Sequence, residues 1–306
     1  MAVVEPGTES QHTLAEQLSE LRAQPMGDTR VGRARSRFLA LAERATTWGP
    51  LRPVAEIGWE AARRDAAVGG SVLAAALAYR IFIWLLPLAL VLVLGLGWVA
   101  DTSSLLNGSG IGSYVAGSVA AATENVSTWA RVTGLVVGGL VLLYETYVLL
   151  RAMRAVTAIA WGLPIRRTAS PPRDTLVFLA GAVGFTVTAS GGATIRRQLD
   201  FPVDVVAWVA SGALLSTIFL AFAWWLLPHA ATDWTGVAPG AGLVGLATIL
   251  IGVFNWLILY PWLSQKEETY GVLGVAAGLL FSFFLIGRTI ELAASLNAVL
   301  AERRAA

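Results

Sequence analysis

Long apolar runs alternate with short polar segments along most of the chain. The runs lie at about residues 71–100, 132–151, 175–195, 205–227, 236–260 and 271–293. A helix of roughly 20 apolar residues is long enough to cross the hydrocarbon core of a bilayer. The pattern therefore predicts an all-α fold, a polytopic transmembrane helical bundle with about six spans.

The third run is the least apolar of the six. Glycine and hydroxyl residues dilute it, among them Gly181, Gly184, Thr186 and Ser190. Small residues in transmembrane helices favour close contact with other helices over contact with lipid. We expect this helix to be enclosed by its neighbours, and five spans are the alternative count.

Polar segments flank the apolar region and divide the chain into four parts. We expect a polar, Arg-rich cytoplasmic tail over 1–50, an interfacial amphipathic helix over 51–70, the six-helix domain over 71–295 and a short cytoplasmic tail over 296–306. The first tail is interpreted as a solvated, partly disordered segment. An interfacial anchor attracted to anionic lipid is the sharper alternative.

The composition supports a membrane location and excludes several kinds of site. The chain has 56% hydrophobic and only 14% charged residues, whereas soluble domains usually have about 25% charged residues. It has no cysteine, which excludes disulfides and thiolate metal sites. The net charge is only +2, and its arginines gather in particular loops, so we expect no nucleic-acid partner.

The distribution of Lys and Arg predicts the orientation. With the N-terminus inside, 16 of the 22 Lys and Arg residues fall in inner segments and four fall in outer loops. Cytoplasmic loops of membrane proteins carry this excess of positive charge. The sequence therefore predicts a multi-pass protein with both termini in the cytoplasm.

Four charged residues fall within the predicted spans and form an expected intramembrane polar cluster. They are Arg80 in the first run, Glu145 in the second, and Arg288 and Glu291 in the sixth. A charge at the bilayer centre costs about 2.5–3.5 kcal/mol on insertion scales, so each needs a partner. Arg288 and Glu291 are three residues apart on one helix face, which leaves Arg80 and Glu145 as an interhelical pair. The charges either fix helix register as buried ion pairs or line a cavity or relay.

Small and polar residues recur at helical spacing along three predicted spans. Either tight helix packing or a substrate path would use such stripes. Pro87 should kink the first helix, and Asn255 is a polar residue in the outer half of the fifth. The expected close-packing residues are Gly134, Gly138, Gly240, Gly245, Gly252, Gly274 and Gly278.

Known catalytic motifs are missing from the chain. The two histidines, His12 and His229, lack the spacing of a zinc site, and no phosphate-binding P-loop motif occurs. We therefore expect no metal, no cofactor and no catalytic residue, and we do not expect an enzyme.

Several short motifs resemble the YihY/BrkB family of bacterial inner-membrane proteins over about residues 50–300. They are Ala74 to Tyr79 followed by Pro87, then Pro239-Gly240-Ala241, Tyr270 to Gly274, and Leu292 to Asn297. The chain departs from the family pattern at Trp84, where a serine is expected. The resemblance implies the bacterial cytoplasmic membrane and a role in envelope physiology. The family's label of ribonuclease BN conflicts with the missing metal ligands.

These observations favour a carrier or flippase-like protein that moves an amphiphile or a small solute. Its expected partners are membrane lipids and a small-molecule or lipid substrate, and no oligomeric state is predicted. The alternative is a non-transporting scaffold or regulator that recruits partners through its N-terminal tail. An enzyme acting on a lipid-linked substrate is a third, weaker hypothesis.

Overall fold

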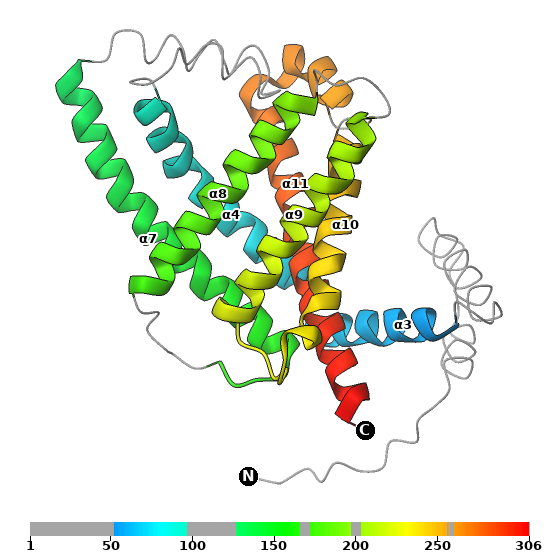
Figure 1. Ribbon diagram of the computed structural model, residues 1–306. Coiled ribbons are helices and arrows are strands. Elements are labelled where there is room, and N and C mark those ends of the chain that lie inside the picture. Colours follow the sequence, from blue (N-terminus) through cyan, green and yellow to red (C-terminus); the bar gives the residue numbers. More distant parts are fainter. Residues whose placement is uncertain are drawn as a thin grey trace. The chain divides into compact units, whose positions relative to one another are not determined.

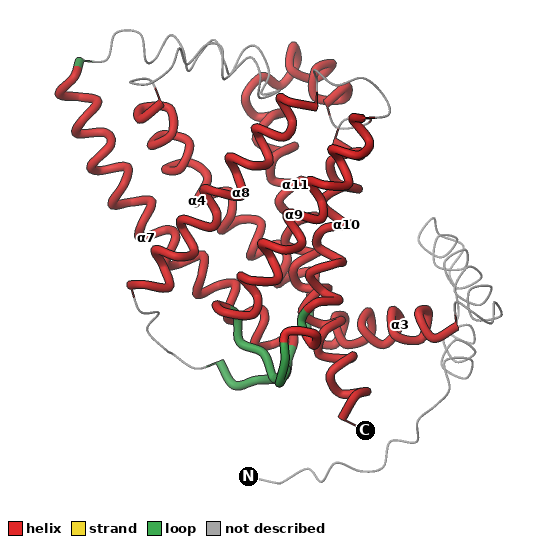
Figure 2. The backbone as a smooth tube through the Cα atoms, in the orientation of Figure 1, coloured by secondary structure: helices red, strands yellow, loops and turns green. Residues whose placement is uncertain are grey.

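The computed structural model describes residues 52–96, 127–165, 172–196, 203–255, 257 and 260–305, and these residues contain helices but no strand (Figure 1, Figure 2). This confirms the all-α fold class. The elements are α3 (Arg52–Ala67), α4 (Gly70–Leu96), α7 (Thr128–Ala160), α8 (Pro172–Arg196), α9 (Val203–Leu226), the 3₁₀-helix η1 (Trp234–Gly236), α10 (Ala238–Phe254) and α11 (Tyr260–Ala305).

The chain forms two compact units, residues 1–63 and 64–306, and their boundary falls within α3. The six α-helices that the structure describes after α3 all belong to the second unit. The tail predicted over residues 1–50 lies outside the described residues.

Each of the six predicted spans coincides with one helix. Within the described residues, four segments are long and apolar enough to cross a membrane: Gly70–Leu92, Thr128–Ala160, Val209–Leu226 and Ala276–Arg304. Helix α10 is apolar but shorter. The fold is that of an integral membrane protein, and about six spans is consistent with it.

The prediction of an outer loop between the fifth and sixth spans was wrong. Residues 261–270 are helical, because α11 is continuous from Tyr260 to Ala305. Pro261 fits the first turn of a helix, where its missing N–H costs nothing, and the Gln, Lys and Glu residues that follow are good helix formers. With 46 residues, α11 is about 69 Å long if straight, more than a membrane span requires.

From α4 to α11, helices that are consecutive in sequence run in opposite directions (Figure 1) and pack in a definite order. Helix α4 lies between α7 and α11, α10 lies between α9 and α11, and α8 contacts α7 and α9. The indole N–H of Trp84 on α4 donates a 2.9 Å hydrogen bond to the hydroxyl of Thr146 on α7. The residue that departs from the family pattern therefore joins two spans.

Glycines allow the closest approaches between helices. A Cβ added at Gly287 of α11 would lie 2.7 Å from the carbonyl oxygen of Ala74 and 3.3 Å from the Cβ of Leu77, both on α4. At Gly245 of α10 it would lie 2.8 Å from the carbonyl oxygen of Gly212 on α9. Helices in lipid associate largely through van der Waals packing, for which such bare positions are needed.

We predict that Gly287→Ala destabilises the α4–α11 contact, because the new methyl group meets backbone that cannot move independently. The matched control is Gly139→Ala on α7, where an added Cβ meets nothing within 4 Å. Alanine is preferred over glycine within a helix by about 0.5–1 kcal/mol, so the control should be neutral or stabilising. Unfolding midpoints of the two purified variants test this, and equal midpoints would contradict it.

Candidate functional site: the charged end of the bundle

One end of the bundle gathers interhelical charge contacts, and we call it the charged end. It is the end at which α4, α8 and α10 begin and α7, α9 and α11 finish. The last turn of α3, from Arg64 to Ala67, leads directly into α4 there. Three arginines at this end each bond to groups on other helices.

Arg288 of α11 makes the most complete of these contacts. Its Nη1 and Nη2 donate to Oδ1 and Oδ2 of Asp65, a bidentate pair, and Nη1 also donates to Oε2 of Glu291 at 3.0 Å. The hydroxyl of Ser295 donates to the other Glu291 oxygen at 3.1 Å. The side chains of Asp65 and Glu291 are 5% and 0% exposed, against 28% for Arg288. We call these four residues the Asp65–Arg288 cluster.

A sharp turn between α3 and α4 positions Asp65 in the cluster. Gly69 has φ +71°, a conformation that favours glycine, and its N–H bonds to the carbonyl of Ala66. Gly70 must also lack a side chain. A Cβ there would lie 2.6 Å from Cγ of Asp65 and 2.7 Å from Nη1 of Arg288.

The surroundings of Asp65 decide its protonation. Burial raises the pKa of Asp65, but hydrogen bonds with Arg288 and Glu291 and the charge of Arg288 outweigh burial and hold that pKa below its ordinary 3.8. The guanidinium therefore favours the ionised form of Asp65, as expected for its bidentate carboxylate partner.

The other two arginines bond to the carboxyl ends of helices. Arg64 donates from Nε to the carbonyl of Ala160 at 2.7 Å and pairs with Glu302. Arg154 donates from Nε to the carbonyl of Leu226 at 2.8 Å and pairs with Asp174 at 2.6 Å. Each cation therefore satisfies a free carbonyl at a helix end while linking α7 to another part of the bundle.

The predicted cluster of four charged residues does not form within the described part of the chain. Arg288 and Glu291 pair as expected from their spacing, but their third partner, Asp65, was assigned to the interfacial helix and missed. Its position next to the Gly69–Gly70 turn was the available signal.

Arg80 and Glu145 do not form an ion pair among the described residues. Thr146 lies opposite Trp84, so Glu145 is about one helical turn, roughly 6 Å, further from the charged end than Arg80. Side chains also tilt toward the N-terminus of their own helix. Because α4 and α7 are antiparallel, Arg80 and Glu145 point away from each other.

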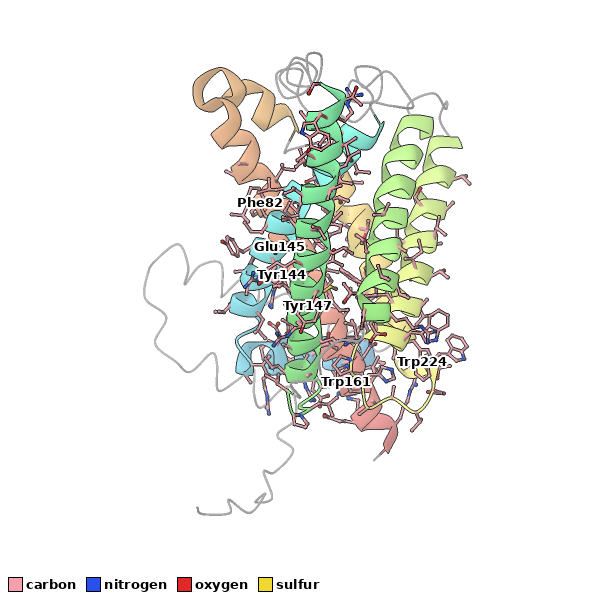
Figure 3. All side chains as sticks on the ribbon, turned by 90° about the vertical axis from the view of Figure 1, so that its left-hand side faces the viewer. Phe82, Tyr144, Glu145, Tyr147, Trp161 and Trp224 are labelled. Atoms are coloured by element: carbon pink, nitrogen blue, oxygen red, sulfur yellow. The ribbon has the colours of Figure 1, made fainter. Side chains whose placement is uncertain are left out.

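The surroundings of Arg80 and Glu145 are not those of a buried ion pair. Arg80 is exposed on α4. Oε2 of Glu145 is buried without a hydrogen-bond partner among the described residues. Figure 3 shows Glu145 on α7 close to Tyr144, with Tyr147 nearer the end of the helix that carries Trp161, and Tyr144 is 64% exposed.

The remaining predicted residues lie mainly at helix contacts. Gly134 and Gly138 of α7 lie against side chains of α4, Gly240 and Gly245 are buried, and Gly278 is buried. Pro87 is buried within α4. Asn255 at the end of α10 accepts a 3.3 Å hydrogen bond from Ser282 of α11. Gly252 is partly buried, and the surroundings of Gly274 lie outside the described part of the structure.

Comparison with known proteins identifies the family. The sequence profile described as Virulence factor BrkB matches residues 62–306. The chain belongs to the BrkB family. No curated protein and no solved structure gives a significant match.

Two of the short motifs that resemble the BrkB family meet in the structure. Asn297, which ends the last motif, accepts a 2.7 Å hydrogen bond from the N–H of Gly240 in the Pro-Gly-Ala motif. It also donates to the carbonyl of Val237 at 3.1 Å. One buried amide therefore satisfies backbone groups at the start of α10 and ties that helix to α11.

A small cavity lies beside this contact. It has about 20 Å³ of space, is lined by His229, Thr157 and Asn297 among others, and has room for about one water molecule. The ring of His229 stacks on Trp224 at 4.7 Å, and its Nε2 lies 3.1 Å from the carbonyl oxygen of Trp224. Among the described residues, no group of His, Asp and Glu could hold a metal ion.

We predict that Asp65→Asn destabilises the protein, because it leaves the partly buried guanidinium of Arg288 without its bidentate acceptor. Breaking a buried ion pair from one side costs about 3–5 kcal/mol. The control is Glu302→Gln, which removes a pair whose carboxylate is 61% exposed and should change stability little. Equilibrium unfolding of both variants in detergent tests the difference, and equal losses would contradict it.

We also predict an acid-dependent loss of stability that originates at Asp65. Its pKa is lower in the folded than in the unfolded chain, so its contribution is present above the ordinary value of 3.8 and lost as pH falls through the folded value. Unfolding measured from pH 7 to acid should show this loss in the wild type. Asp65→Asn should lack that component, and an unchanged acid profile in the variant would contradict the assignment.

Proposed function

We propose that the chain is a carrier of the bacterial inner membrane that moves an amphiphilic lipid between leaflets, with both termini in the cytoplasm. One observation carries the proposal: polar groups in the middle of the α4–α7 pair face outward, where a lipid can reach them. Arg80 is exposed on α4, and Tyr79 and Tyr144 are 55% and 64% exposed. Polar groups at membrane depth are costly and usually functional.

The outward direction of these groups favours an amphiphile over a small solute. A solute needs an enclosed polar path, whereas an amphiphile can keep its tail in the bilayer while its headgroup contacts the protein surface. The cavity beside His229 holds about one water molecule and is too small for a solute. Glu145 is half-buried, and its Oε2 has no hydrogen-bond partner among the described residues. A headgroup that donates hydrogen bonds would reach this oxygen by displacing the side chains that cover it.

The charged end supports a carrier as well. Arg64, Arg154 and Arg288 hold the helices together there through ion pairs and carbonyl contacts. Such contacts can break and form again without repacking of an apolar core, as alternating access requires. The excess of Lys and Arg in the segments at this end supports its cytoplasmic placement.

A lipid-movement assay tests the proposal. The full chain is reconstituted in phosphatidylethanolamine–phosphatidylglycerol vesicles that contain a fluorescently labelled phosphatidylethanolamine, and dithionite is added outside. We expect quenching to pass the half-maximal plateau set by the outer leaflet. Glu145→Gln should slow this phase by about tenfold, corresponding to about 1.4 kcal/mol in the barrier, while Val148→Ile, a nearby apolar change on α7, should not.

Quenching that stops at the plateau of protein-free vesicles would exclude this lipid as a substrate. The scaffold hypothesis would then gain weight, because nine Lys and Arg residues precede the first span and could bind acidic partners. Deletion of residues 1–45 tests that alternative through the loss of partners that copurify with the full chain.

A further inference from the structure

The Asp65–Arg288 cluster is out of charge balance. It contains two carboxyl groups and one guanidinium, and both carboxyl side chains are almost fully buried. If both were ionised, the cluster would carry one uncompensated negative charge in a site away from water. Such a charge is so costly that a buried group usually takes up a proton or another cation.

Among the described residues, the neighbouring charges do not supply the missing positive charge. From the last turn of α3, Arg64 is directed to Ala160 and Glu302. From α4, Gly70 contributes no side chain. From α7, Arg154 is engaged with Asp174 and Leu226. From α11, Ser295 donates a neutral hydrogen bond to Glu291.

The geometry of the two acids indicates which cation completes the cluster. A single nitrogen, Nη1 of Arg288, donates to both Asp65 and Glu291, so the two carboxyl groups are neighbours. A hydrogen bond between two carboxyl groups requires a proton on one of them. A metal ion would instead need several oxygen ligands directed at it, and these oxygens already face a guanidinium.

We propose that the Asp65–Glu291 pair is a proton-binding site, which holds one shared proton at neutral pH and links its release to loosening of the contact between α11 and the α3–α4 turn. The proton belongs to the pair and not to one residue. The side chain of Arg288 is 28% exposed, so the cluster reaches the surface of the bundle at this residue.

Release of the proton would affect the junction between α11 and the turn that begins α4. The cluster joins Arg288 of α11 to the turn at Gly69 and Gly70, and α11 packs along α4 from there. A second buried negative charge would repel Asp65 from Glu291 and weaken this junction. Proton binding at this site does not depend on the lipid movement proposed above. If the protein does move lipid, the proton is the ion to which lipid movement would couple.

Glutamine at position 291 provides the test, because its amide has the shape of a protonated carboxyl group and can donate to Asp65. The full chain in detergent is measured by infrared spectroscopy at neutral pH, where a protonated carboxyl group has a carbonyl band that a carboxylate lacks. We expect Glu291→Gln to remove the equivalent of one protonated carboxyl group per chain. Glu302→Gln is the matched control and should leave the band unchanged.

A second measurement keeps the result independent of expression or folding defects. Stability of the wild type should fall as pH rises and the shared proton is lost, whereas Glu291→Gln should match the wild type at neutral pH and lack the alkaline fall. An unchanged carboxyl band in Glu291→Gln, or the same alkaline fall in both proteins, would overturn the proposal. Lipid movement is measured in a separate assay, so a protein that moves no lipid would still give a clear result for the proton-binding site.

Discussion

The bidentate contact between Arg288 and Asp65 is the interaction on which the arrangement of the charged end depends. It joins the longest helix of the bundle to the turn that starts the first span, across 223 positions in sequence. Asp65 is almost fully buried, and its charge there depends on the guanidinium that faces it. The contact requires Gly70, because a Cβ there would collide with Asp65 and Arg288, and it requires Gly69, whose positive φ forms the turn.

Close helix packing and polar contacts both stabilise the bundle. Apolar surfaces give little preference for helix contact over lipid contact, so specificity must come from shape and from hydrogen bonds. Close approaches at Gly245 and Gly287 provide shape. Trp84 with Thr146, and Asn297 with the start of α10, provide directional bonds. The two family-like motifs that meet at Asn297 are therefore parts of one structural contact.

Function is proposed to reside in the polar groups that this framework does not use. Among the described residues, Arg80 and Glu145 do not pair with each other. Arg64 and Arg154, by contrast, bond to helix ends. Groups that have a structural partner can fix the closed form of one end. Arg80, which faces outward, and the partly buried Glu145 are the groups that we propose meet a lipid headgroup.

The sequence alone determined the membrane class, the positions of the six helices and the family, because apolar run length and short motifs are local properties. It also predicted the Arg288–Glu291 pair, which depends only on helical spacing. Tertiary structure decided that Asp65 completes this pair and that Arg80 and Glu145 remain apart. Those outcomes depend on the turn between α3 and α4 and on the register and opposite directions of α4 and α7, which spacing within one helix does not encode.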